Sequence, residues 1–90
     1  MNKKRTRLEV VRDLLKILTE HKEVKITHLI YKSNLSNNSI KPYIEDLIKN
    51  NLIENSIINE RRLFKITQKG REFLEDFNRM KVFSESYGLG

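Results

Sequence analysis

The chain contains no cysteine, so disulfide bonds, thiolate metal sites and thiol nucleophiles are excluded. Its two histidines, His21 and His28, lie in one short stretch without a third metal ligand at a suitable spacing. The sequence has no glycine-rich phosphate loop and no nucleophile elbow, and its acidic residues are scattered. We therefore expect no enzyme activity, no metal, no cofactor and no small-molecule ligand.

The chain also lacks a long apolar run. Its basic start, MNKKRTR, is followed by LEVVRDLLKILTE, in which charged residues interrupt the apolar ones. Neither a signal-peptide core nor a membrane span is expected from this pattern, which predicts a soluble, cytoplasmic protein. The 90 residues suffice for one domain with one small core, because such a short chain buries only about 60% of its unfolded surface. Without disulfides or zinc, oligomerisation is the remaining common way to stabilise such a domain.

Two apolar stripes with helical spacing run through residues 6–20, one at positions 8, 11, 15 and 18 and the other at 10, 14 and 17. This spacing predicts an amphipathic helix with two neighbouring apolar faces. The second face either packs against a partner helix or widens a single face that the rest of the domain covers. The pattern does not choose between these alternatives.

A helix-turn-helix is predicted downstream. Within EVKITHLIYKSN, Ile26 and its apolar neighbours recur at i, i+3 and i+4, which indicates a short helix. Asn34 suits the left-handed backbone that ends a helix, with Leu35 folding back as the next apolar residue. A second helix then runs to Asn50 and Asn51, and its predicted buried positions are Ile40, Ile44, Leu47 and Ile48.

The start of this second helix is ambiguous because its first part, SNNSIKPYIEDLI, contains a proline. If Ser36 is the N-cap, Pro42 lies in the sixth helical position and distorts the helix near Asn38. If Ser39 is the N-cap, Pro42 lies in the first turn, where its missing N–H costs little. Asn38 and the residue before it then belong to the turn.

A β-hairpin and a final helix complete the predicted order. Two apolar segments, LIENSII and LFKI, flank the polar residues 59–62, as in a hairpin. Thr67 is expected to cap a helix over residues 68–83, and residues 84–90 are expected to form a flexible tail. The order helix, helix, helix, β-hairpin, helix predicts a mainly α (α+β) domain over residues 8–83, a winged helix-turn-helix.

Three motifs carry a resemblance to a known family: YKSNLS, the helix end NNLIE, and ITQKGREFLE. Together they resemble the archaeal winged-helix family of small dimeric chromatin-associated proteins and transcription regulators, over residues 6–80. Family members read Ala-Asn-Leu-Ser at the turn, Gly-Leu-Ile after the recognition helix, and Leu-Thr-Glu-Lys-Gly-Arg at the last helix. This chain has Asn51 in place of the glycine and Pro42 where a helix former is commoner. The resemblance implies a helix that starts at Ser36, here with an irregular first turn.

Charge is sorted along the sequence. Basic residues exceed acidic ones by 18 to 12, for a net charge of +6 and a pI near 9.7, so polyanions are natural partners. The excess lies in residues 1–7, 21–43 and 59–71, which hold a basic N-terminal arm, the helix-turn-helix and the wing. These are the elements that face DNA in a winged helix. The intervening segments and residues 72–90 are net negative.

Candidate DNA contacts come from these three elements, with the recognition helix at residues 36–50 in the major groove and the wing at 59–62. Arm and wing residues would contact phosphates or a minor groove, and the alternatives are a disordered basic terminus for the arm and a solvated turn for the wing. Asparagines and serines at the helix start would contact bases, although they also suit capping and turns. The candidates are Lys3, Lys4, Arg5, Arg7, Ser36, Asn37, Asn38, Ser39, Lys41, Tyr43, Arg61 and Arg62.

The interpretation is therefore a nucleoid-associated protein that binds double-stranded DNA and regulates transcription. An architectural chromatin protein is the first alternative, and a winged helix that docks an acidic protein partner is the second. A homodimer through the first and last helices is expected, because family members commonly dimerise through the last helix and both helices here have apolar stripes. The candidate interface residues are Leu14, Phe73, Phe77 and Met80.

Overall fold

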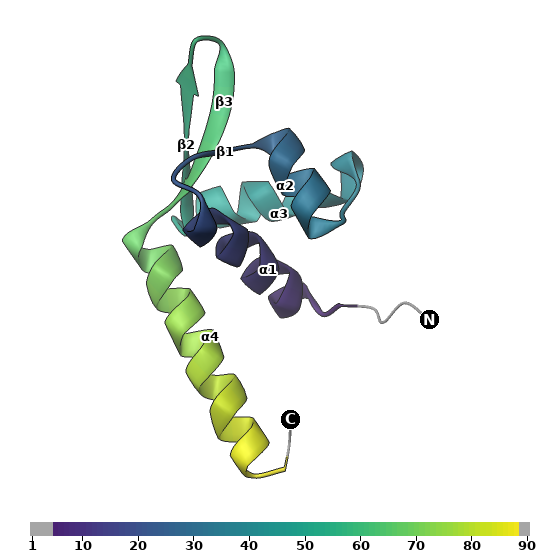
Figure 1. Ribbon diagram of the computed structural model, residues 1–90, viewed down its shortest axis with the longest axis vertical. Coiled ribbons are helices and arrows are strands. Elements are labelled where there is room, and N and C mark those ends of the chain that lie inside the picture. Colours follow the sequence, from purple (N-terminus) through teal and green to yellow (C-terminus); the bar gives the residue numbers. More distant parts are fainter. Residues whose placement is uncertain (1–4, 89–90) are drawn as a thin grey trace.

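A computed structural model describes residues 5–88 and confirms the winged helix-turn-helix (Figure 1). Its elements run along the chain as α1 (Arg7–Glu20), β1 (Val24–Lys25), α2 (Ile26–Ser33), α3 (Asn37–Lys49), β2 (Ile53–Ile58), β3 (Arg61–Ile66) and α4 (Gln68–Ser86). The three strands form an antiparallel sheet in the order β1-β3-β2. The β2–β3 hairpin and α4 leave the helical body in opposite directions (Figure 1).

Strand β1 was not predicted. It is only two residues long, pairing Val24 with Phe64 and Lys25 with Leu63, and so short a segment has no detectable period-two pattern. Its position between α1 and α2 ties the helix-turn-helix to the sheet. Val24 is buried there with Phe64.

Helix α1 buries both of its apolar stripes inside one molecule except at Leu8, which is 56% exposed. Val10, Leu14, Leu15 and Leu18 are all buried, and Val11 and Ile17 are partly buried against the same core. The wide single face is therefore correct, and Leu14 as a dimer contact is wrong because none of its surface is exposed. The remaining core comes from every other element, namely Val24, Leu29, Ile40, Ile44, Leu47, Ile53, Phe64, Ile66 and Leu74.

Asparagine ends both helices of the helix-turn-helix, as predicted. Asn34 has φ 59° and ψ 33° after α2, and Asn51 has φ 60° after α3. Beyond α3 the Leu52 N–H donates to the Leu47 carbonyl at 2.9 Å, and the Asn51 N–H donates to Ile48 at 3.0 Å. This pair of bonds is the Schellman arrangement, which satisfies carbonyls that the helix leaves free.

Helix α4 is longer than predicted. Thr67 caps it as expected, since its side chain accepts from the Gly70 N–H at 3.0 Å, but the helix continues to Ser86 rather than ending at residue 83. The prediction of a flexible tail from residue 84 is therefore wrong for residues 84–86, which are helical. Within α4 only Gly70 and Leu74 are buried, so most of the helix extends past the body without covering it.

Candidate nucleic-acid interface

Helix α3 begins at Asn37 because Ser36 caps it. The Ser36 side chain accepts a hydrogen bond from the Ser39 N–H at 3.1 Å, and its hydroxyl donates to Ser39 Oγ at 2.8 Å. The Ile40 N–H donates to the Ser36 carbonyl at 3.0 Å. The start at Ser36 is therefore correct, but the first turn is regular. Ser36 and Ser39 both serve the cap.

Pro42 lies inside α3, and the helix runs through it. Its ring has no N–H for the carbonyl of Asn38, which lies four residues earlier. Both residues are exposed, so water can bond to this carbonyl in place of the missing N–H. The proline is tolerated because the bond it removes lies on the solvent side of the helix.

A row of four residues lies opposite the buried face of α3. At 100° per residue, Asn38, Pro42, Glu45 and Lys49 point away from the stripe of Ile40, Ile44 and Leu47, and all four are exposed. Asn37 and Lys41 flank this row and are also exposed. We call Asn38, Pro42, Glu45 and Lys49 the outward row. Glu45 and Lys49 belong to it but were not among the predicted contacts.

Arg7 lies beside α3 rather than in a free arm. It is the first residue of α1, and its guanidinium lies 5.4 Å from the centre of the Tyr43 ring. It also forms an ion pair with Asp46 of α3. Tyr43 is only half-buried, so Arg7 and Tyr43 together border α3 on the α1 side. The arginine offsets a carboxylate that would otherwise repel a polyanion there.

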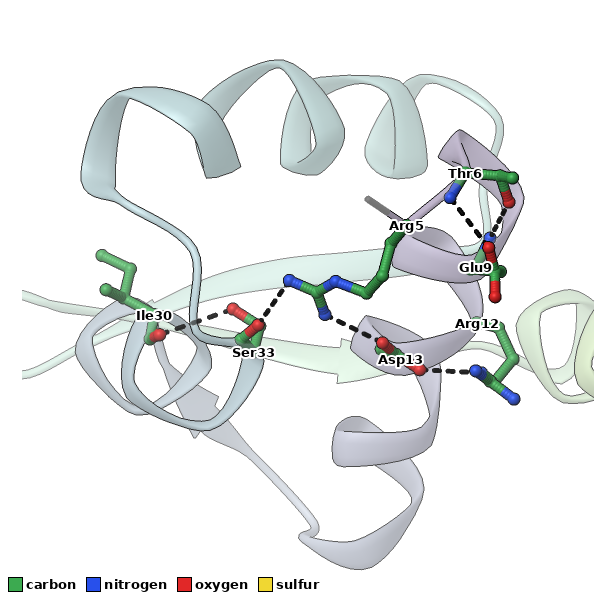
Figure 2. A network of polar contacts seen from close by, with 7 residues as sticks. All are labelled: Arg5, Thr6, Glu9, Arg12, Asp13, Ile30 and Ser33. Atoms are coloured by element: carbon green, nitrogen blue, oxygen red, sulfur yellow. Dashed lines mark hydrogen bonds and ion pairs between the residues drawn. The ribbon is translucent and has the colours of Figure 1, made fainter. Parts of the chain in front are cut away.

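Arg5 is anchored to the turn of the helix-turn-helix (Figure 2). Its Nη1 donates to Asp13 Oδ2 at 2.9 Å, and its Nη2 donates to the Ser33 carbonyl at 2.8 Å. Ser33 ends α2, where free carbonyls and the helix dipole favour a cation. Asp13 also accepts from Arg12 Nε at 2.7 Å. Arg5 is therefore a structural residue. The prediction of a free arm over residues 1–7 is wrong for residues 5–7.

Thr6, which follows Arg5, is the N-cap of α1. The Thr6 N–H donates to Glu9 Oε1 at 2.9 Å, and the Glu9 N–H donates to Thr6 Oγ1 at 3.1 Å, a reciprocal capping box (Figure 2). The hydrogen bond from the Thr6 backbone, reinforced by its side chain, lowers the pKa of Glu9. Lys3 and Lys4, two predicted contacts, lie outside the described residues.

The wing turns at Asn59 and Glu60, which have φ of 52° and 64°. Positive φ at both central residues defines a type I′ turn, the two-residue connection that matches the twist of a hairpin. Arg61 therefore follows the turn, and Arg62 is the second residue of β3 rather than part of the loop. Both are exposed. Arg62 Nε donates to Asn55 Oδ1 at 3.2 Å, and its guanidinium lies 5.0 Å from the ring centre of buried Phe64.

A groove of about 500 Å³ runs between α1 and the outer part of α4. Phe73 and Phe77 are stacked in it, with ring centres 6.5 Å apart, and Arg12 lies 5.6 Å from the Phe77 ring centre. Leu8 and Met80 also line it and are 56% and 71% exposed. Three of the four predicted dimer residues thus share one surface, while Leu14 lies in the core. We call this surface the α1–α4 groove.

The two histidines of the chain lie close together. The rings of His21 and His28 meet edge to face with centroids 4.8 Å apart. Within residues 5–88, no three potential metal ligands of the His, Cys, Asp and Glu types gather in one place. The helices of this part of the chain are all too short or too polar to cross a membrane.

Helices α2 and α3 joined by a tight turn, with a β-hairpin and a further helix after them, define a winged helix-turn-helix protein. A family model of the winged helix-turn-helix matches residues 4–85. The chain therefore belongs to the winged helix-turn-helix family. No curated protein matches its sequence.

Solved structures share this fold over most of the chain. Sso10a-2, a DNA-binding protein from Sulfolobus solfataricus, superposes with a TM-score of 0.79 at 24% identity, over 93% of this chain and 87% of its own. BpsR from Bordetella bronchiseptica, whose DNA binding is regulated by 6-hydroxynicotinic acid, gives 0.76 at 16% identity, over 90% and 60%. The transcriptional repressor CouR, bound to a 23-mer DNA duplex, gives 0.71 at 14% identity, over 84% and 54%. At these identities the likeness shows the shared fold.

Proposed function

We propose that this protein binds duplex DNA and regulates transcription, with α3 in the major groove and the wing on the flanking backbone or minor groove. The observation that carries the proposal is the outward row of α3, which is fully solvent-facing although the opposite side of the same helix is core. An α-helix with such a free polar face fits the width of the major groove. The named relatives that bind DNA share the fold and support this reading.

The outward row suggests which contacts are made. Asn38 can pair with adenine through its amide, and Glu45 can accept from the amino group of cytosine. Lys41 lies beside this row and Lys49 is the last residue of α3, and both suit phosphate. Pro42 offers only apolar contact, such as that with a thymine methyl. Because Asp46 forms an ion pair with Arg7, Glu45 is, among the described residues, the unpaired acidic side chain closest to the bases.

An architectural role is the second candidate, and the composition of the outward row favours it. Pro42 makes no hydrogen bond through its side chain, and Glu45 repels phosphates, so the middle of the row offers few contacts. A protein that reads few bases and binds mainly through backbone contacts would have this composition. Selection of bound duplexes from a random pool separates the two roles. A sharp consensus indicates a regulator, and a featureless pool indicates architecture.

Binding itself is tested by titrating salt against a labelled duplex. Each neutralised phosphate contributes roughly −0.9 to the slope of log K against log salt concentration. Arg61→Ala should reduce affinity and make the slope shallower by about one phosphate. Arg79→Ala is the control, because it removes the same charge from exposed α4. Within the described chain Arg79 forms ion pairs only with Asp76 and Glu75. This variant should leave the affinity and the salt slope unchanged. Equal losses in the two variants would contradict a wing contact, and no binding at low salt would contradict DNA binding.

A docking module for an acidic protein is the remaining alternative from the charge pattern. It predicts that Arg61→Ala releases a protein partner while DNA affinity stays unchanged. We further expect no catalytic role, and a cytoplasmic protein associated with the nucleoid.

We also propose that two copies associate through the α1–α4 groove. The groove is apolar and open, and the exposed residues Phe83 and Tyr87, whose ring centroids lie 4.9 Å apart, continue the face of Met80 along α4. A helix stripe this apolar is costly to leave in water at about 25 cal/mol per Å². Because Phe77 lines the groove without being fully buried, Phe77→Glu should give a monomer in sedimentation, whereas Glu72→Gln on exposed α4 should not. A wild-type protein that sediments as a monomer would contradict the proposal.

A further inference from the structure

The end of the wing farthest from the core carries two exposed isoleucines. Ile57 is 73% exposed and Ile58 is 47% exposed, although Ile53 at the start of the same strand is buried. They precede the type I′ turn directly. Single exposed apolar residues are ordinary on a protein surface, but two large ones at the tip of a projecting hairpin form a local apolar end.

Each isoleucine has an arginine directly across the ladder. The register pairs Ile57 with Arg62 and Ile58 with Arg61. Because successive side chains of a strand point to opposite faces, one Ile–Arg pair lies on each face of the hairpin tip. Arg62 is fixed by its bond to Asn55 and its contact with Phe64. We call Ile57, Ile58, Arg61 and Arg62 the wing tip.

The protein's own core does not cover the wing tip. Phe64, opposite Asn55, is the last buried residue before the tip. Arg61 lies three residues further along β3, about 10 Å at 3.4 Å per residue. Any cover for the wing tip therefore comes from another molecule. The two guanidinium groups favour a polyanion, and duplex DNA offers apolar base faces next to its phosphates wherever a base step is opened.

The dimensions of DNA indicate how the wing tip meets it. The minor groove of B-DNA is about 6 Å wide, whereas paired strands lie about 4.8 Å apart before their side chains are counted. The hairpin therefore does not fit an undistorted minor groove. An apolar side chain placed between two base pairs opens the groove and bends the duplex towards the major groove. Branched, strand-bound isoleucine is stiff at χ1, which suits a wedge.

We propose that Ile57, the more exposed of the two isoleucines, forms a wedge that enters the minor groove, partly unstacks one base step and bends the duplex. Ile58, on the opposite face of the hairpin, packs against the groove wall, and Arg61 and Arg62 hold the adjoining phosphates. The inference rests on the proposed DNA binding. It adds a bending function and assigns it to a residue that the charge pattern does not select.

The test measures affinity and bending on the same duplex. The duplex has about 30 base pairs, with fluorophores at its ends for energy transfer and 2-aminopurine in a central TA step, the kind of step that is easily unstacked. Anisotropy gives affinity, energy transfer gives the bend, and 2-aminopurine fluorescence reports unstacking. The wild-type protein is compared with the double variant Ile57→Thr, Ile58→Thr. Threonine is also β-branched, so strand preference is kept while the apolar end is lost.

The wild-type protein should bend the duplex by about 20° or more and raise the 2-aminopurine signal. The double threonine variant should lose both effects, while its affinity falls by less than about tenfold because the phosphate contacts remain. Ile57→Val, Ile58→Val should retain the bend. Unchanged bending in the threonine variant, or binding by the wild type without bending, would overturn the wedge and leave DNA binding intact. Absence of binding at low salt would overturn both proposals.

The threonine variant also tests whether the wing tip contacts a second copy of the chain. If the wing tip were instead covered by a second copy of the chain, the variant would sediment at a lower mass than the wild type, and its bend would be unchanged. That result would overturn the wedge. Circular dichroism of the variant should match the wild type, and the valine variant provides the bending control if the threonine variant does not fold.

Discussion

Gly70 is the residue whose substitution tests the packing of this fold most directly. A Cβ at this position would overlap the Leu52 carbonyl oxygen and lie 2.7 Å from Ile66 Cγ1. The Leu52 carbonyl cannot move freely, because it accepts from the Thr67 N–H at 3.1 Å and lies 3.0 Å from the Thr67 hydroxyl. Gly70→Ala must therefore shift the junction where the end of α3, the wing and α4 meet.

The size of the effect follows from three contributions. Overpacking a well-packed site costs about 1–3 kcal/mol, and weakening the bonds to Leu52 costs about 1 kcal/mol for each bond. Alanine is the better helix former by about 1 kcal/mol, which offsets part of the loss. The net expectation is a destabilisation of about 2–4 kcal/mol, or a Tm lower by roughly 10–30 °C for a domain of this size.

Thermal unfolding followed by circular dichroism measures this effect, at one fixed protein concentration because a dimer's Tm depends on concentration. Asn78→Ala is the matched control, since Asn78 is an exposed position of the same helix. It should raise Tm slightly through helix propensity alone. If Gly70→Ala also raised Tm, the close packing of α4 against Leu52 and Ile66 would be refuted.

Three further predictions concern the edges of the helix-turn-helix. Pro42→Ala restores the N–H that can donate to the Asn38 carbonyl. Although the unfolded chain becomes less restricted without proline, the variant should be more stable by about 1 kcal/mol or more in urea unfolding. An unchanged midpoint would contradict the idea that Pro42 costs the helix a hydrogen bond. The pKa of Glu9 is lower in the folded state than its ordinary value of 4.5. Its contribution to the free energy of unfolding is therefore fully present above pH 4.5 and is lost as the pH falls through the lowered pKa. Glu9→Gln should flatten the part of the stability curve that falls as the pH drops below the ordinary value of 4.5, and an identical curve would contradict the lowered pKa of Glu9. Arg5→Ala should cost about 1–2 kcal/mol by loss of a charge-assisted bond, with Arg5→Lys intermediate, and equal stability of all three proteins would refute the anchor.

Much of the fold was predictable because local chemistry and packing agree. Asn34 and Asn51 mark helix ends that need a left-handed residue, and Ser36 and Thr67 are good caps. These residues act on backbone groups a few positions away, so their effect is visible in the sequence. The order of elements followed from them.

What the sequence did not reveal depends on contacts between distant segments. Arg5 looks like part of a basic arm, and only the fold brings it to Ser33, 28 positions away. Leu14 belongs to the second apolar stripe of residues 6–20, which could face a partner helix or the core, and the surrounding elements decide that it is buried. Ile57 and Ile58 look like ordinary strand residues until the register places them at the exposed end of the hairpin. Position in the chain does not carry this information.

The length of α4 has a consequence for the spacing of DNA sites. Its 19 residues extend about 28 Å at 1.5 Å per residue, and only the first part touches its own domain. In the proposed dimer this helix acts as a ruler between the two copies of α3. Inserting seven residues, two helical turns, between Leu74 and Phe77 would move the outer part of α4 about 10 Å beyond α1 and separate the two walls of the α1–α4 groove. Two half-sites at a fixed spacing should then no longer be preferred over a single half-site.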